Sequence, residues 1–252
     1  MTFYKKLLIA LLGIVSCFVF YNYINNNNLR PHDNKIIFGT SADNPPYEFI
    51  DNGQVVGFDI DLAFMIAKEL GKEPIIQNVD FAGLLPLLLT NNIDAAIAAL
   101  TVNDARTKNV DFSSIYAKTE IAIIFHKSDK LDANSALNDK IIGAQFGSIW
   151  ETIATELASK ASNAKVRSLP SNLTLITELL AKNIDLVVME KIQSQRFCKT
   201  SDELDYFVLE SHNSEFAIAL PKNSELTVQI NRALETLKKN GQIELLKNKW
   251  LN

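Results

Sequence analysis

Short apolar strands alternate with amphipathic helices along this 252-residue chain, and the alternation occurs twice. The first series opens with the strand-like Lys35–Gly39 and includes Ile93–Ala98, which is almost entirely small and apolar. The second series opens at Lys140–Gly143 and ends at Ile184–Met189. Strands and helices that alternate at this spacing are typical of βαβ units and a mostly parallel sheet. We therefore predict two α/β lobes rather than one large domain.

Several of the predicted elements carry turn or capping signals. Asp51-Asn52-Gly53 separates two short strands and predicts a hairpin. Asp59 precedes an apolar helical stripe and is predicted to cap that helix. The last helix, Leu226–Lys239, follows all the strands, so it must pack back on the first lobe. The apolar face of a helix in the second series is predicted to consist of Leu173, Ile176 and Leu180.

Two further strand-like segments have parallel sequences and mark where the chain leaves and re-enters the first lobe. They are Glu120–Phe125 and Glu215–Leu220, and each is followed by a short polar stretch that contains a lysine. A chain that crosses twice between two lobes would have its hinge at such strands. We therefore assign residues 35–123 and 218–252 to lobe 1 and residues 124–217 to lobe 2.

The first two dozen residues differ from everything that follows. Lys5 and Lys6 precede an apolar run of 14 residues, Leu7–Phe20, as in a secretory signal. This run is shorter than the ~20 residues that a bilayer-spanning helix needs. We predict that residues 1–24 form a signal peptide or an N-terminal anchor, and that the polar residues 25–34 form a flexible leader.

Cys17 adds an alternative for the N-terminal segment. It ends Ile14-Val15-Ser16-Cys17, a loose lipobox in which the cysteine would carry a lipid, whereas an ordinary apolar cysteine is the other interpretation. Removal of residues 1–24 would change the formal net charge from -4 to -6, because two lysines and no acids leave. It would also leave Cys198 as the single cysteine, so that no internal disulfide could form. We expect an exported, periplasmic protein.

Composition and motifs exclude several classes of function. A mildly acidic chain without a run of lysine and arginine is not expected to bind nucleic acid. The three histidines stand apart from other metal-ligating side chains, so no metal site is expected. Gly147-Ser148 lacks the G-x-S-x-G pattern of a nucleophile elbow, and the chain has no Walker A motif. We expect a monomer without a cofactor and without catalytic residues.

An ordered series of motifs resembles the bacterial extracellular solute-binding proteins, family 3, which are the polar amino-acid receptors of ABC importers. The series extends over about Ile36 to Trp250, and such an order is more specific than any single motif. The resemblance implies a type II periplasmic-binding-protein fold, with two α/β lobes joined by two hinge strands and a ligand closed between them. The motifs are Pro46-Tyr47-Glu48-Phe49, Gly57-Phe58-Asp59-Ile60-Asp61-Leu62, Asp80-Phe81-Ala82-Gly83-Leu84, Leu100-Thr101-Val102-Asn103 with Arg106, and Gly143-Ala144-Gln145-Phe146-Gly147-Ser148.

The resemblance also implies partners for both charges of an α-amino acid. A receptor that buries a carboxylate and an ammonium must pair both of them. Arg106 is predicted to hold the carboxylate, because a guanidinium offers two parallel donors, and a solvated helix arginine is the alternative. Thr101 is predicted to add hydroxyl and amide bonds. Glu190, where the family usually has aspartate, is predicted to hold the ammonium together with the carbonyl of Ala99; a surface acid is the alternative for Glu190.

The other predicted ligand contacts come from both lobes. Gly147, Ser148 and Ile149 resemble a turn that meets the carboxylate on closure, and a plain turn capped by Ser148 is the alternative. Phe81 matches an aromatic residue that packs on the ligand side chain, and a core position is its alternative. Asn44 stands where the family has a second aromatic residue.

Two positions bear on the side chain of the ligand. Ser41 stands where the family often carries an acid, and Gln145 is polar and neutral at a position that meets the ligand side chain. Without an acid to neutralise a second cation, we expect a polar neutral amino acid.

Two functions fit this scaffold. In the first, the chain is the periplasmic substrate-binding protein of an amino-acid ABC transporter, a receptor that delivers its ligand to a permease in the inner membrane and makes no bond. In the second, it resembles the cyclohexadienyl (prephenate) dehydratases, and Glu190 acts as a general acid. Partners for both a carboxylate and an ammonium favour the receptor.

Overall fold

The computed structural model describes residues 34–133 and 135–251. The predicted signal or anchor with Cys17, and all of the predicted leader except its last residue, lie outside the described residues. Among the described residues, no helix has both the length and the apolar character needed to cross a membrane. Residues 36–252 form one compact unit, which carries all the elements discussed below.

Sheet 1 has five strands in the order β5-β1-β6-β13-β7. β1 (Lys35–Thr40) is parallel to β6 (Ala95–Ala96), and β5 (Glu73–Asn78) is an edge strand. β13 (Ala219–Pro221) is antiparallel to β6 and to β7 (Val110–Phe112). The small residues of β6 lie at the centre of the sheet, where side chains from both faces crowd the strand.

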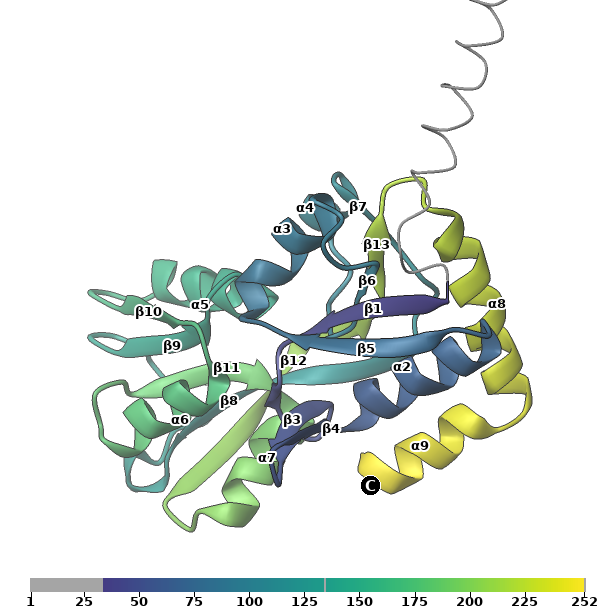
Figure 1. Cartoon of the computed structure of the whole chain (residues 1–252). Coiled ribbons are helices and arrows are strands. Elements are labelled where there is room, and N and C mark those ends of the chain that lie inside the picture. Colours follow the sequence, from purple (N-terminus) through teal and green to yellow (C-terminus); the bar gives the residue numbers. More distant parts are fainter. Residues whose placement is uncertain (1–33, 134, 252) are drawn as a thin grey trace, which may run out of the picture. The chain divides into compact units, whose positions relative to one another are not determined.

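Helices cover both faces of sheet 1 (Figure 1). α2 (Phe58–Glu69), α8 (Glu225–Lys239) and α9 (Gln242–Trp250) pack on one face and share a single apolar core with it. α3 (Leu84–Leu89) packs on the other face. α8 therefore lies on the first sheet, as predicted for the helix that follows all the strands, and α9 lies there as well.

Sheet 2 has five strands in the order β10-β9-β11-β8-β12. β9 (Ile141–Gln145) is parallel to β10 (Lys165–Leu169) and to β11 (Leu186–Glu190). β8 (Ala117–His126) is antiparallel to β11 and to β12 (Leu204–Phe216). α5 (Ile149–Ser159) packs on one face of this sheet. The opposite face is covered by α6 (Asn172–Leu180) and α7 (Lys191–Thr200).

The apolar face of α6 differs from the predicted one. Leu175, Ile176 and Leu179 are buried, whereas Leu173 and Leu180 are 51% and 36% exposed. Leucine and isoleucine occupy most positions of this helix, so two faces show the same apolar spacing. Contact with sheet 2 decides between them.

The two sheets are joined where β12 leads into β13. The amide of Ala217 donates to the carbonyl of Leu100 at 3.1 Å, and Thr101 forms an isolated bridge with Phe216. The predicted class of two α/β lobes joined by two strands is confirmed, but both sheets are mixed rather than mostly parallel. The connecting strands cause this difference, because they enter each sheet antiparallel to their neighbours. β8 already pairs within sheet 2 at Ala117, and the lobe boundaries at 123/124 and 217/218 stay a prediction.

A third, antiparallel sheet consists of β2 (Asp43–Asn44), β3 (Glu48–Asp51) and β4 (Gln54–Val56). Asn52 and Gly53 connect β3 to β4 with φ angles of 48° and 78°. Two successive positive φ angles are the requirement of a type I′ hairpin turn, which asparagine and glycine meet at low cost. The predicted hairpin is therefore confirmed.

The first turn of α2 departs from the prediction that Asp59 caps it. Gly57 is the N-cap residue and no side chain caps the helix. The Asp59 Oδ2 atom instead accepts hydrogen bonds from the amide of Ala99 at 2.7 Å and from the hydroxyl of Tyr116 at 2.8 Å. The sequence alone does not distinguish a helix cap from an acid that binds groups elsewhere in the fold, because an acid near the start of a helix is favourable in either case. Asp59 thereby ties α2 to the segment after β6.

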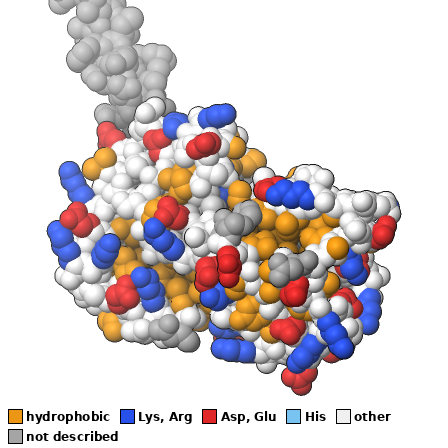
Figure 2. Space-filling model, turned by 180° about the vertical axis from the view of Figure 1, so that it is seen from behind, with side chains coloured by type: hydrophobic (Ala, Val, Ile, Leu, Met, Phe, Trp, Pro, Cys, Tyr) orange, Lys and Arg blue, Asp and Glu red, His pale blue; other side chains and the backbone are white. Residues whose placement is uncertain are grey.

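Charged side chains of both signs are interspersed on the face of the molecule shown in Figure 2. Lysine and arginine side chains form no continuous strip on this face of the described residues. A polyanion such as nucleic acid is attracted by a continuous basic surface. The expectation of no nucleic-acid partner stays a prediction.

Candidate ligand-binding site

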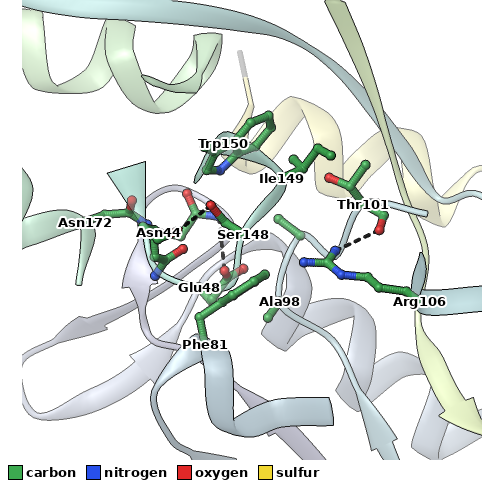
Figure 3. Close-up of a pocket in the computed structure, with 12 residues that line it drawn as sticks. Asn44, Glu48, Phe81, Ala98, Thr101, Arg106, Ser148, Ile149, Trp150 and Asn172 are labelled. Atoms are coloured by element: carbon green, nitrogen blue, oxygen red, sulfur yellow. Dashed lines mark hydrogen bonds between the residues drawn. The ribbon is translucent and has the colours of Figure 1, made fainter. Parts of the chain in front are cut away.

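A cavity lies between loops of lobe 1 and the β9–α5 and β10–α6 turns of lobe 2 (Figure 3). It encloses about 310 Å³ of space, counted with its opening to solvent. The cavity is lined by Asn44, Glu48, Phe81, Ala98, Ala99, Thr101, Arg106, Gln145, Ser148, Ile149, Trp150 and Asn172.

The structure brings most of the predicted contact residues together in this cavity. Gly147 and Glu190 are predicted contacts that do not line it, although Gly147 neighbours a residue that does. The predicted residues that line the cavity are Asn44, Phe81, Ala99, Thr101, Arg106, Ser148 and Ile149.

A short helix places Arg106 at one end of the cavity. α4 (Asp104–Thr107) begins after Asn103, whose side-chain oxygen accepts a hydrogen bond from the amide of Arg106 at 2.8 Å. Arg106 is 8% exposed, and burial lowers its pKa to about 10, so the guanidinium stays charged at neutral pH. No acidic side chain among the described residues pairs with it. A buried cation without a counter-charge is costly, so an anionic ligand group would complete this site.

The guanidinium of Arg106 is held in one orientation. Its Nη1 atom donates to the carbonyl of Thr101 at 2.8 Å, and Nη2 donates to the carbonyl of Gly147 in lobe 2 at 3.1 Å. Its carbon lies 5.4 Å from the centre of the Phe81 ring, which adds a cation–π contact. The predicted alternative for Arg106, a solvated helix residue, is therefore wrong.

Two hydroxyl groups that were predicted to meet the ligand already have protein partners. The Thr101 and Ser214 hydroxyl oxygens are 2.6 Å apart. The Ser148 hydroxyl donates to the carbonyl of Gln145 at 2.6 Å and accepts from the amide of Glu151 at 3.3 Å. Ser148 therefore caps α5, which was its alternative interpretation, and its ligand contact stays a prediction.

Glu190 caps α7 and does not line the cavity. Its Oε2 atom accepts from the Thr119 hydroxyl at 2.8 Å and from the amide of Ile192 at 3.0 Å, and Oε1 accepts from the amide of Gln193. The residue is 1% exposed, which contradicts its alternative interpretation as a surface acid. Burial raises the pKa of Glu190 to about 7. A contact between Glu190 and a ligand ammonium stays a prediction.

The motif comparison missed four residues that line the cavity, namely Ala98 and three residues with larger side chains. Glu48 of β3 and Asn172 of α6 are 1% and 2% exposed, and Trp150 of α5 is buried as well. The one sequence signal for Glu48 is an acid inside the otherwise apolar motif Pro46–Phe49. Asn172 and Trp150 carry no local signal, because ordinary first-turn helix positions look the same.

Unpartnered oxygen atoms gather at the end of the cavity opposite Arg106. In Figure 3, Asn44 and Asn172 lie away from Arg106, and Glu48 lies beside Asn44. Asn44 Oδ1, Glu48 Oε2 and Asn172 Oδ1 are buried and have no hydrogen-bond donor among the described residues. A buried acceptor left without a donor costs about 1–3 kcal/mol. This end of the cavity therefore suits a ligand group that is rich in N–H donors.

Asp43 links the two lobes beside the cavity. Its Oδ2 atom accepts from the amide of Asn172 at 2.7 Å and from Gln145 Nε2 at 3.2 Å. Burial raises the pKa of Asp43. Gln145, which was expected to meet the ligand side chain, lines the cavity, but its side-chain amide donates to Asp43. Together with the bond from Arg106 to Gly147, these contacts hold the lobes in a closed arrangement.

Buried carboxyl groups around the cavity predict that stability depends on pH. Burial raises the pKa of Asp59 to about 6 and of Glu190 to about 7, and it raises the pKa of Glu48 well above its ordinary value. The folded protein therefore keeps protons that the unfolded chain has already released above about pH 4.5. The free energy of unfolding then falls as pH rises toward 7, by about 1.4 kcal/mol per pH unit for each retained proton.

We expect the ligand-free protein to unfold at a higher temperature at pH 5 than at pH 7.5, as measured by circular dichroism. A higher melting temperature at pH 7.5 than at pH 5 would contradict the assignment of raised pKa values to these carboxyl groups.

Known proteins with similar sequences are amino-acid-binding proteins, and the similarity covers most of their length. Residues 36–252 match the profile of the bacterial extracellular solute-binding proteins, family 3. The arginine-binding extracellular protein ArtP of Bacillus subtilis is 34% identical over 229 residues, which cover 90% of this chain and 89% of that protein. A probable histidine-binding protein of Campylobacter jejuni is 28% identical over 257 residues, with 98% of each chain covered.

Solved structures show the same fold. The substrate-binding protein AbpA of Streptococcus pneumoniae, bound to L-arginine, has a TM-score of 0.79 and 32% identity over 86% of this chain and 94% of its own. An ancestral arginine-binding protein bound to arginine has a TM-score of 0.81 and 34% identity over 88% of this chain and 100% of its own. The ancestral amino-acid-binding protein AncCDT-1, a precursor of cyclohexadienyl dehydratase, has a TM-score of 0.79 and 29% identity over 87% and 96%. The two lobes described above thus form a type II periplasmic-binding-protein fold.

Proposed function

This chain belongs to the bacterial extracellular solute-binding proteins, family 3, and we propose that it captures a free α-amino acid for an ABC importer. The observation that carries the proposal is the buried guanidinium of Arg106, which lies at one end of a cavity between two lobes and has no acidic partner in the part of the chain that the structure describes. The ligand carboxylate is the counter-charge that this guanidinium lacks. The protein binds and releases its ligand and breaks no bond.

The ligand side chain points to the opposite end of the cavity and carries a cation with several N–H donors, as arginine does. The unpartnered oxygens of Asn44, Glu48 and Asn172 support this assignment, because a guanidinium has five N–H donors. Two relatives are named as an arginine-binding protein and a probable histidine-binding protein, and both names agree with a ligand of this kind. This proposal replaces the expected neutral ligand, since that expectation assumed a cleft without a second acid and Glu48 supplies one.

The remaining contacts to the ligand backbone follow the sequence-based assignment. Thr101, Ala99 and Ile149 offer backbone groups at the cavity, and Phe81 offers a ring face. Glu190 is the proposed ammonium partner, although this contact requires its side chain to leave the cap of α7 in part.

The proposed setting is the periplasm, where the closed, loaded form meets the permease of the importer in the inner membrane. The family consists of extracellular proteins, and the charged, apolar N-terminal segment fits export. We propose that the chain acts there as a monomer.

The enzyme alternative has less support in the site itself. A dehydratase would need a general acid at the substrate, and Glu190, which was assigned that role, does not line the cavity. The likeness to AncCDT-1 is a likeness to an amino-acid-binding protein, as its name states.

A thermal-shift titration of the full chain with the twenty amino acids and prephenate tests the proposed function. A ligand at 100 times its Kd stabilises the fold by about 2.7 kcal/mol, which gives a clear rise in melting temperature. We expect arginine to give the largest rise. Turnover of prephenate with no shift from any amino acid would overturn the receptor assignment.

A further inference from the structure

Two buried carboxyl groups meet at the wall of the ligand cavity. Glu48 lines the cavity, whereas Asp59 lies in the core of lobe 1, and the two are 1% and 0% exposed. Each carboxyl group acts on the pKa of the other, and each has one buried oxygen, Glu48 Oε2 and Asp59 Oδ1, that no donor among the described residues satisfies. Ionised carboxylates only accept hydrogen bonds, so two of them cannot bond to each other. One proton held between them satisfies both orphaned oxygens.

The surrounding donors decide which of the two acids carries the proton. Asp59 Oδ2 accepts from the amide of Ala99 at 2.7 Å and from the hydroxyl of Tyr116 at 2.8 Å, and both bonds favour the charged form. Glu48 receives one such bond, from Asn44 Nδ2 to Oε1 at 3.1 Å. Burial, followed by the charge of Asp59, raises the pKa of Glu48. In the ligand-free protein Glu48 is therefore the acid and Asp59 the carboxylate.

The other titratable groups that face this pair do not remove the need for the proton. Asp43 adds a negative charge from β2, and Tyr47 and Tyr116 stay neutral because burial and the neighbouring carboxylates raise their pKa values. Glu190 acts on Tyr47 from the second lobe. Arg106 lines the same cavity at its other end, where the ligand carboxylate neutralises it.

We propose that this pocket exchanges a proton for a cation, so that the positively charged side chain of the ligand reaches Glu48 as the proton of Glu48 leaves. The O–H bond of Glu48 breaks, the proton passes to solvent, and Glu48 Oε2 accepts an N–H group of the ligand. The carboxyl pair changes from one negative charge to two while the ligand side chain brings one positive charge. The net charge of the buried group is unchanged, which avoids an unpaired buried charge in either state. The proposal rests on the proposed function and deepens it.

The exchange makes arginine binding depend more steeply on pH than the binding of a neutral analogue. Citrulline has the shape of arginine with a neutral urea group in place of the guanidinium, so Glu48 keeps the proton that it shares with Asp59. Release of one proton per ligand raises the affinity about tenfold for each pH unit below the pKa of Glu48. Arginine should show this slope in addition to the dependence on Glu190 that it has in common with citrulline.

Isothermal titration of the full chain in two buffers of different ionisation enthalpy measures the proton count directly. At pH 6 we expect close to one more proton released per arginine than per citrulline, because the ammonium of either ligand also displaces the proton of Glu190, whose pKa is about 7. Glu48→Gln offers Asp59 an amide donor in place of the acid, and so it should fold. In this variant we expect equal proton release with the two ligands and at least a tenfold smaller preference for arginine over citrulline. Glu69→Gln, at an exposed position of α2, should behave as the unchanged protein.

The outcomes separate the exchange from the proposed function. Arginine binding that releases no more protons than citrulline binding, or a wild-type arginine preference in Glu48→Gln, overturns the exchange and leaves the receptor function standing. Absence of binding by any amino acid overturns both. An excess of proton release with arginine that persists in Glu48→Gln assigns that proton to another group and refutes the role of Glu48.

Discussion

Replacement of Arg106 by alanine is expected to weaken amino-acid binding by about three orders of magnitude. The guanidinium is buried and already oriented by the carbonyls of Thr101 and Gly147, so its remaining donors meet a carboxylate without further ordering. Removing one partner of a buried ion pair costs about 3–5 kcal/mol, because the other charge is left uncompensated. Titration calorimetry with the ligand found by thermal shift measures the loss.

Two matched variants show whether the loss belongs to the site. Arg106→Lys keeps the charge but loses the planar fork, so we expect an intermediate loss of affinity. Arg232→Ala removes an exposed arginine of α8 and should leave both binding and melting temperature unchanged. The Arg106→Ala protein should remain folded, because it loses a buried charge that has no acidic partner in the empty site. Wild-type affinity in Arg106→Ala would remove Arg106 from the site.

Features that depend on neighbouring residues in the sequence were predictable. Asn52-Gly53 requires a tight hairpin wherever it falls between two strands, and the hairpin is present. Arg106 follows Thr101 by five residues, and this local spacing places both of them on one cavity wall. Such features follow from backbone geometry within a short segment, which does not depend on the rest of the fold.

Features that depend on contacts between distant segments were not predictable. Glu190 looked free to meet a ligand, but the amides at the start of α7 and the hydroxyl of Thr119 engage it. Asp59 looked like a helix cap, but Ala99 and Tyr116 draw it into the core. Thr119 lies far from Glu190 in the sequence, as Ala99 and Tyr116 do from Asp59, so these contacts follow from the tertiary fold and not from spacing. The amides of Ile192 and Gln193, by contrast, are close to Glu190 in the sequence and form a local helix cap.

The backbone next to Glu48 depends on tertiary contact in the same way, because the carbonyl groups of Pro46 and Tyr47 pack against Gly57. A Cβ atom at Gly57 would lie 2.2 Å from the carbonyl oxygen of Tyr47 and 2.9 Å from that of Pro46. Both carbonyls are held in place, because the amide of Asp59 donates to that of Tyr47 at 2.9 Å and the amide of Phe58 donates to that of Pro46 at 3.0 Å. The φ angle of 134° is also one that residues with a side chain rarely adopt.

Gly57→Ala is therefore expected to lower the free energy of unfolding by about 4 kcal/mol, the sum of backbone strain and overpacking. For a chain of this size that corresponds to a fall of about 8–16 °C in melting temperature. Gly71→Ala is the matched control, because Gly71 also has a positive φ angle, 66°, but no atom lies within 4 Å of its Cβ position. It should cost about 1–2 kcal/mol, the ordinary penalty for a left-handed residue. Gly57 also differs from Gly71 in its backbone, because φ 134° with ψ -179° lies in a region that is essentially confined to glycine. The difference between the two variants therefore measures this backbone strain together with the close approach at Tyr47. Equal losses would show that neither makes Gly57 more costly to replace than an ordinary left-handed glycine.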